Sequence, residues 1–194
     1  AALYFDYDQP ESMDLLINRI EANRSALVQV IVATGLLHQN DAGPEKTFRN
    51  LSPDFLQRVM WINALGPLLL LSRLLTELDR NSVTQIGVLS ARVGSIEDNQ
   101  LGGWYSYRAS KAALNQLLKT LAIELKRTHK GVQILSLHPG TTDTQLSKPF
   151  QARVPEHKLF SPDFAAGALL DVMDSYSDKE SGSFLDWDGQ PIPW

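Results

Sequence analysis

The sequence contains no cysteine, only four histidines and no concentration of positive charge. Without cysteine, the chain can form neither a disulfide framework nor a thiolate nucleophile. The histidines show no metal-ligand spacing, so the sequence predicts no metal site. The 18 Lys and Arg residues are dispersed among 22 Asp and Glu residues and leave a net charge of -4, which argues against a nucleic-acid partner.

Long hydrophobic runs are also absent. The longest apolar stretch, residues 64–71, contains Gly66 and Pro67 and is far shorter than the roughly 20 residues that cross a membrane. The chain shows no signal-peptide pattern. We therefore expect a cytoplasmic protein without a membrane partner.

The remaining pattern is that of an α/β protein. The 194 residues, 43% of them hydrophobic, can bury one sizeable core, and we expect a single domain over residues 1–194. Short β-type runs alternate with helical patterns, as in a doubly wound parallel sheet with helices on both faces. The expected strands are residues 3–5, 26–34, 83–89, 132–137 and 184–186.

Capping and helix-breaking residues predict where the helices begin and end. The run Asp8-Gln9-Pro10-Glu11 has the form of a capping box that opens a helix with Leu15, Leu16 and Ile20 on its apolar face, and residues 23–25 end it. Further helices are expected over residues 52–78, with a kink at Pro67, over residues 106–129, with Gly131 as the C-cap signal, and over residues 161–176.

Tyr107 and Lys111 lie four residues apart at the start of an apolar helical pattern, so both side chains share one helix face. A phenol titrates near pH ~10, and an ammonium one turn away can stabilise its phenolate. The pair could therefore exchange a proton near neutral pH if a ligand or a lid covered it. The alternative is a solvated helix pair.

The neighbours of this pair give it a family context. A strand ends at Ser90, the loop 94–103 follows, then the helix with Tyr107, and a second strand ends in His138-Pro139-Gly140. This order resembles the short-chain dehydrogenase/reductase family, and its motifs are most similar to the C-factor-like and sniffer-like branch. The resemblance implies a Rossmann-like fold and an NADP- or NAD-dependent conversion between a carbonyl and an alcohol.

The resemblance implies a catalytic role for three residues. Tyr107 matches the general acid and base, and Lys111 matches the lysine that lowers the phenol's pKa and binds the nicotinamide ribose. Asn63 matches the asparagine of a water-linked proton relay. An asparagine in an apolar helix could equally make a local hydrogen bond at the kink.

The expected serine that hydrogen-bonds the substrate carbonyl is altered. The stretch reads Ser90-Ala91-Arg92-Val93-Gly94, so alignment on the glycine places Ala91 at the serine position. Either Ser90 or Ser95 substitutes for it, or polarisation of the carbonyl is weakened. Losing one such donor costs about 10²- to 10³-fold in rate.

The resemblance also implies where the nicotinamide cofactor binds. Its candidate residues follow the strands at the carboxyl edge of the sheet, where ligands of such folds bind. They are Asp6, Thr34, Gly35, Lys111, Pro139, Gly140, Thr142 and Thr144. Asp6 could instead cap a helix. Residues 145–160 resemble the variable substrate lid, or form a plain surface loop.

The family's glycine-rich phosphate turn does not occur in the sequence. The strand at residues 3–5 already matches the family's third strand, so we expect the sheet to be N-terminally incomplete, lacking two strands and one helix. Residues 3–5 should then either move beside residues 28–32 or stay far from them.

Three functions remain open at this point. The first is an oxidoreductase acting on a small carbonyl or alcohol. The second is a non-catalytic signalling or binding member of the same fold, suggested by Ala91 and the missing glycine turn. The third is an interaction scaffold, since in the family the helices of Asn63 and Tyr107 pack across a two-fold axis, which implies a homodimer or homotetramer. The apolar faces within residues 68–75 and 112–121 would suit such a bundle or simply cover the sheet.

Overall fold

The computed structural model describes residues 2–24, 27–40, 42–176 and 181–194. A four-stranded parallel sheet in the order β1-β2-β3-β6 forms its centre. Its strands are β1 (Gln29–Val32), β2 (Thr84–Leu89), β3 (Val132–His138) and β6 (Ser183–Asp186). The predicted α/β fold is confirmed, although β1 is shorter than expected and Ala26 lies outside the described residues.

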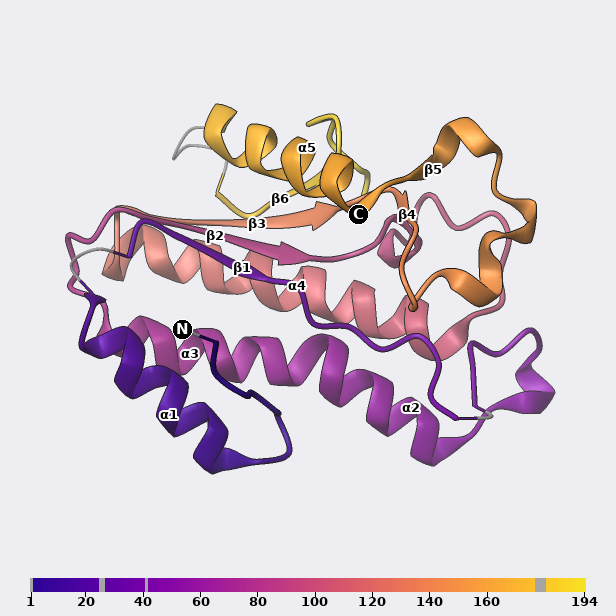
Figure 1. The fold of residues 1–194 in the computed structure, drawn as a ribbon, viewed down its shortest axis with the longest axis horizontal. Helices are drawn as coiled ribbons and strands as arrows, with labels where there is room; N and C mark the ends of the chain where they lie inside the picture. The colour runs from indigo at the N-terminus through magenta and orange to yellow at the C-terminus, as the bar shows by residue number, and fades with distance from the viewer. Residues whose placement is uncertain (1, 25–26, 41, 177–180) are drawn as a thin grey trace.

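Helices cover both faces of the sheet. In Figure 1, α5 (Pro162–Ser175) lies above the sheet, and α1 to α4 lie below it. The lower helices are α1 (Pro10–Glu21), α2 (Pro53–Met60), α3 (Gly66–Glu77) and α4 (Tyr105–Thr128), with a π-helical turn, η3 (Trp61–Leu65), between α2 and α3. Short 3-10 turns in the described part of the chain include η2 (Phe48–Asn50), η4 (Arg92–Gly94), η5 (Lys148–Arg153) and η6 (Glu156–Lys158). A separate two-stranded sheet pairs β4 (Thr141–Thr142) with β5 (Leu159–Phe160).

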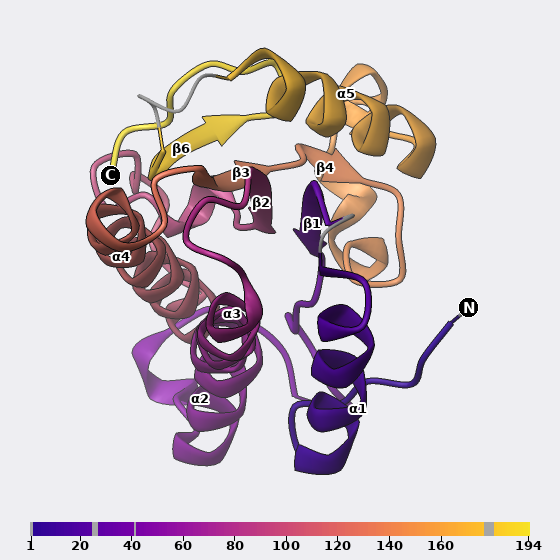
Figure 2. The ribbon, with the colours of Figure 1, turned by 90° about the vertical axis from the view of Figure 1, so that its left-hand side faces the viewer.

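The core fills the space between the sheet and its helices. Below the sheet, Leu71 and Leu74 of α3 meet Leu118 of α4, and all three are at most 1% exposed. Above it, Met173 of α5 packs against Leu135 of β3. The apolar faces of α3 and α4 thus mainly cover the sheet (Figure 2), which was one of the two expectations for them.

The predicted strand at residues 3–5 is wrong. This segment has no strand conformation, and β1 pairs with β2 alone among the described residues. The chain instead turns so that the Phe5 ring meets the Tyr7 ring edge-on at 4.9 Å, and the Tyr7 hydroxyl lies 2.9 Å from Thr34 Oγ1. The segment is therefore held by aromatic packing rather than by sheet pairing.

Two expectations about helix ends are also wrong, and one about a helix face is wrong in part. The N-cap of α1 is Gln9 without a side-chain bond, because the Asp8 carboxylate accepts hydrogen bonds from Arg58 and Trp61 instead. Of the predicted apolar face, Leu16 and Ile20 pack against the core as expected, but Leu15 is 62% exposed. The buried residues of this helix are Ser12 and Ile17. Helix α4 ends at His129 as its C-cap, while Gly131 lets β3 approach the Ser82 carbonyl, 2.5 Å from the position that a Cβ would take.

The distortion expected near Pro67 is present one turn earlier, as the π-helical turn Trp61–Leu65. The helical stretch Pro53–Glu77 has 25 residues and a hydropathy of 1.5 over its most apolar window, which would suffice to cross a membrane by length and composition. Half of that window is buried, and the stretch packs against α1 and α4. Core helices meet the same criterion, and this burial is typical of one.

Gly94 permits a close approach between η4 and α4. A Cβ on Gly94 would lie 2.8 Å from Lys111 Cβ and 2.9 Å from the Lys111 carbonyl carbon. We expect Gly94→Ala to lower the free energy of unfolding by about 1–3 kcal/mol, because backbone atoms must shift. Urea denaturation measures this.

The matched control is Gly167→Ala in α5, where no atom lies within 4 Å of the added Cβ. It should raise stability by up to about 1 kcal/mol, since alanine favours a helix more than glycine does. Similar changes in both variants would contradict the assigned contact.

Candidate active site

Three predicted residues meet where β1 and β2 end beside α4. A Cβ built on Gly35 would lie 3.9 Å from Asn63 Oδ1 and 4.0 Å from Lys111 Nζ. The backbone at Gly35 therefore lies within side-chain contact distance of both polar groups. Ligands of parallel sheets bind at this carboxyl edge.

Asn63 is completely buried in the π-helical turn, and its amide group is fully used. Its Oδ1 accepts from the Leu36 N–H at 2.7 Å, and its Nδ2 donates to the Leu36 carbonyl at 2.8 Å and to Ser110 Oγ at 3.0 Å. Asn63 thus ties the segment after β1 to α4. These partners lie 27 and 47 residues away in the sequence, so the bonds are not the local ones expected at the kink. Ser110 lies one turn from Tyr107, and a proton relay through Asn63 remains a prediction.

Tyr107 and Lys111 are both buried, at 7% and 3% exposure. Lys111 Nζ lies 5.9 Å from the centroid of the Tyr107 ring and donates to the Leu89 carbonyl at 2.8 Å. Burial raises the pKa of Tyr107 to about 12 and lowers the pKa of Lys111 to about 8. In this conformation the lysine does not lower the phenol's pKa, because burial outweighs an ammonium that is bound to another group.

The segment predicted as a lid lies over Tyr107. Leu146 and Phe150 pack against the apolar cluster that contains Tyr107, and the Trp104 ring lies 5.1 Å from the Phe150 ring and 6.2 Å from the Tyr107 ring. The cluster also includes Leu37, Phe55, Val59 and Ala91. These contacts leave Tyr107 only 7% exposed.

In the stretch of residues 90–94, Ala91 and not a serine lies near Tyr107, as the alignment on Gly94 indicates. Ala91 is 8% exposed and belongs to the same cluster as Tyr107. Ser90 points elsewhere, because its hydroxyl donates to Asn115 Oδ1 at 2.6 Å. The Ser95 hydroxyl accepts from the Asp98 N–H at 3.0 Å. Neither serine hydroxyl is free to replace the missing one in this conformation.

The turn after β3 brings Pro139 and Gly140 to the same edge of the sheet. Gly140 has a φ of +71°, and a Cβ there would lie 2.5 Å from the Phe160 ring and 3.2 Å from the Trp187 ring. Only glycine therefore fits under this aromatic pair. Thr142 is half-buried in β4, and Thr144 is exposed in the following turn.

Two candidate residues near the N-terminus are engaged in local contacts. The Asp6 carboxylate accepts from the Asp8 N–H at 2.9 Å and from the Tyr4 hydroxyl at 3.2 Å. It thus stabilises the turn before α1, which is close to the alternative role as a cap. Thr34 lies beside Gly35 and shares a hydrogen bond with the buried Tyr7.

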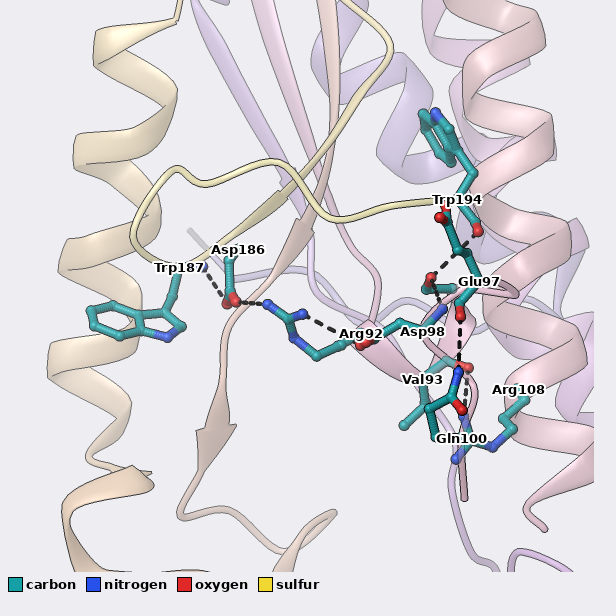
Figure 3. A network of polar contacts seen from close by, with 10 residues as sticks. Arg92, Val93, Glu97, Asp98, Gln100, Arg108, Asp186, Trp187 and Trp194 are labelled. Atoms are coloured by element: carbon teal, nitrogen blue, oxygen red, sulfur yellow. Dashed lines mark hydrogen bonds and ion pairs between the residues drawn. The ribbon is translucent and has the colours of Figure 1, made fainter. Parts of the chain in front are cut away.

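A network around Arg92 fixes the segment that carries Ala91 (Figure 3). The Arg92 guanidinium forms ion pairs with Asp186 of β6 and, at 3.4 Å, with Asp98. The Glu97 N–H donates to the carbonyl of Trp194 at 2.9 Å. Arg108 of α4 donates to the Val93 carbonyl at 3.3 Å. The loop after β2 is therefore bound to β6, to the C-terminus and to α4.

His138, at the end of β3, is a half-buried residue whose Nδ1 atom is buried. Its Nδ1 has no hydrogen-bond partner among the described residues. Burial lowers the pKa of His138 to about 4; Asp186, its register partner on β6, raises the pKa, and Arg92 and Lys111 lower it. His138 is therefore neutral at physiological pH.

This depressed pKa predicts a pH-dependent stability. Between pH 6.5 and about 4, the unfolded chain binds a proton at His138 that the folded protein excludes. The free energy of unfolding should therefore decrease as the pH is lowered from 6.5 to about 4, by about 3 kcal/mol in total. Urea denaturation of the protein and of His138→Gln at both ends of the window measures this, with exposed His157→Gln as the control. An unchanged slope in His138→Gln would contradict the assignment.

Two groups of contacts could not be found from the sequence. Glu45 is buried against Ser106, 61 residues away, and Arg92 reaches Asp186 across 94 residues. A charged residue in a loop carries no signal for such a partner. Among the residues that the structure describes, no group of three or more His, Asp or Glu side chains is placed to hold a metal ion.

Comparison with known proteins shows that the sequence is similar to short-chain dehydrogenases. A family model described as short chain dehydrogenase matches residues 1–155. The 1-hydroxy-2-glutathionyl-2-methyl-3-butene dehydrogenase of Rhodococcus sp. (strain AD45) is 33% identical over 189 residues, which cover 97% of this chain and 78% of that protein.

Two further relatives extend the comparison. The C-signal protein of Myxococcus xanthus is 36% identical over 137 residues, which cover 71% of this chain and 77% of that protein. The structure of the NADPH-bound carbonyl reductase from chicken fatty liver superposes with a TM-score of 0.82 at 25% identity, covering 100% of this chain and 77% of the other.

Proposed function

Because this chain belongs to the short-chain dehydrogenase family, we propose that it is an NAD(P)-dependent oxidoreductase that interconverts a carbonyl and an alcohol. The observation that carries this proposal is the buried Tyr107, which lies with Lys111 at the carboxyl edge of the sheet under an apolar lid. General acid catalysis requires such a positioned proton donor.

The residues present fit the nicotinamide half of the cofactor. Gly35 lies next to Lys111, and His138, whose Nδ1 has no hydrogen-bond partner among the described residues, is followed directly by Pro139 and Gly140. We propose that the remaining contacts come from Asp6, Thr34, Thr142 and Thr144. When bound, the nicotinamide supplies or accepts the hydride.

Tyr107 would supply the proton. With a pKa of about 12, its phenol is protonated at neutral pH. It can donate this proton to the oxygen of a carbonyl group whose carbon receives a hydride. Alcohol oxidation needs the phenolate, which Lys111 stabilises only when its ammonium leaves the Leu89 carbonyl. The protonated phenol, which is the form present at neutral pH, is the form that reduction requires. Asn63 holds the Leu36 backbone and Ser110 beside this site, and a proton relay through it remains a prediction.

The substrate would be a small, uncharged carbonyl compound. Tyr107 lies in an apolar cluster that includes the rings of Trp104, which precedes α4, and of Phe150 in the lid segment. Desolvating a charged substrate there would be costly. We further propose a soluble, cytoplasmic homodimer or homotetramer, for which exposed Leu69 and Ile123 on α3 and α4 offer apolar contact surface.

A second candidate function is a non-catalytic signalling or binding role. It is supported by Ala91, which removes the usual hydroxyl, and by the 36% identity to the C-signal protein. Fluorescence titration with NADPH and NADH, followed by turnover with a panel of aldehydes and ketones, separates the two functions. The proposed enzyme binds one of the two dinucleotides and reduces a carbonyl compound. Binding without turnover would favour the second function, and no binding at all would contradict the first.

A further inference from the structure

Helix α4, which carries Tyr107, has no N-cap side chain that bonds to its first turn. Its N-cap residue is Trp104, whose side chain makes no capping bond and whose φ is +53°. Gly102 and Gly103 before it also have positive φ values. A bulky residue in the left-handed region persists only when tertiary contacts hold it. Something outside the helix must therefore fix this turn.

Glu45 supplies those contacts. Its carbonyl accepts from the Trp104 N–H at 2.5 Å, and its Oε2 accepts from the Ser106 N–H at 3.0 Å. Its Oε1 accepts from the Ser106 hydroxyl. Backbone N–H groups in the first turn of a helix have no intrahelical partner, so Glu45 performs the task of a capping residue from a distant loop.

The Glu45 carboxylate is buried inside the protein and is not a surface group. Glu45 is 5% exposed and Ser106 is fully buried. The partners found for the carboxylate are the N–H and hydroxyl groups at the start of a 24-residue helix. The positive end of the helix dipole stabilises a negative charge there. Among the residues that the structure describes, the carboxylate is thus satisfied without an ion pair.

The loop that carries Glu45 also contacts the surroundings of Tyr107 through Leu36 and Leu37. Asn63 binds both backbone groups of Leu36, and Leu37 packs in the cluster that contains Tyr107. The segment from Leu36 to Glu45 is therefore anchored to the π-helical turn at one end and to α4 at the other. Tyr107 is only one residue beyond Ser106, so the anchor sets where the phenol lies.

We propose that Glu45 is a positioning residue for Tyr107, acting as the N-cap that α4 lacks. Its catalytic consequence rests on the proposed function, but its structural consequence does not. Removing the cap frees the first turn of α4, and displacing a reacting group by about 1 Å can cost on the order of 10²-fold in rate.

The test compares Glu45→Ala with Glu45→Gln. Alanine removes both side-chain contacts, whereas glutamine keeps an oxygen that accepts from the Ser106 N–H and an amide that donates to its hydroxyl. Hydrogen exchange by NMR should be about 10-fold faster at residues 105–108 in Glu45→Ala than in the wild-type protein, with the middle of α4 unchanged. Glu45→Gln should restore most of this protection.

Activity gives the second readout. In Glu45→Ala we expect kcat to fall about 10- to 10²-fold with a nearly unchanged KM for NADPH, and Glu45→Gln should recover it. The matched control is Glu11→Ala, which removes an exposed acidic residue from the first turn of α1. It should change neither readout at α4.

Several results would overturn the inference. Unchanged exchange at residues 105–108 in Glu45→Ala, or a uniform loss of protection along α4 with unchanged kcat, would each do so. If Glu45→Ala does not fold, Ser106→Ala removes the hydroxyl contact alone and should show a smaller increase in exchange at the same residues. An absence of turnover in the wild-type protein would count against the proposed function only, since the exchange data still decide the role of Glu45.

Discussion

Replacing Tyr107 with phenylalanine should reduce the rate of carbonyl reduction by about 10²- to 10⁴-fold, the usual contribution of a positioned general acid. The substitution removes the proton donor and keeps the ring that packs with Trp104. NADPH affinity and unfolding midpoint should therefore change little. Steady-state kinetics and fluorescence titration on the same preparation measure both.

Tyr105→Phe is the matched control for this prediction. Tyr105 lies on the same helix and is 40% exposed, so losing its hydroxyl should leave turnover within a few-fold of the wild-type rate. A Tyr107→Phe variant that keeps turnover within the same range would remove Tyr107 from the mechanism.

Ala91→Ser is expected to raise kcat by up to about 10²-fold, because it restores a hydroxyl donor for the developing oxyanion. The side chain of residue 91 belongs to the buried cluster around Tyr107, so an added hydroxyl would face the reacting carbonyl. The cost is the burial of a polar group, about 1–3 kcal/mol of stability when no substrate is bound.

The control for this gain is Ala109→Ser, which adds the same hydroxyl at an exposed position of α4. It should leave kcat unchanged. If Ala91→Ser lowers kcat or leaves it unchanged while the protein remains folded, another donor already polarises the carbonyl.

The sequence predicted the order of the main elements and the shared helix face of Tyr107 and Lys111. The family resemblance singled out Gly35 and Asn63, which the structure brings beside Lys111. Buried strands appear as continuous aliphatic runs, and the i, i+4 spacing of Tyr107 and Lys111 fixes their common face whatever the rest of the fold does. The carboxyl ends of adjacent parallel strands necessarily meet at one edge. These inferences need only local patterns and topology.

The errors arise where long-range contacts override a local pattern. Asp8 has the composition of a capping residue, but a cation and an indole N–H from α2 and the π-helical turn compete for its carboxylate. Residues 3–5 have strand composition, yet aromatic packing between Phe5 and Tyr7 places them outside the sheet. Local propensity is a weak predictor when tertiary partners are available.

The electrostatic state of Tyr107 was also beyond sequence reasoning. The spacing suggests that Lys111 lowers the phenol's pKa, but the structure pairs the ammonium with the Leu89 carbonyl and buries the phenol under the lid. Burial then dominates, and the pKa of Tyr107 rises to about 12. Which of the two effects prevails depends on hydrogen-bond partners that no spacing rule contains.

The central claim is that the chain reduces a carbonyl compound with a hydride from a nicotinamide cofactor and a proton from Tyr107. The most direct test incubates the purified protein with deuterium-labelled NADPH or NADH and a panel of neutral ketones and aldehydes, and analyses the products by mass spectrometry. We predict an alcohol that carries the deuterium at the former carbonyl carbon, with its formation strongly reduced in Tyr107→Phe. A protein that binds the dinucleotide and transfers no deuterium to any compound of the panel would contradict the claim.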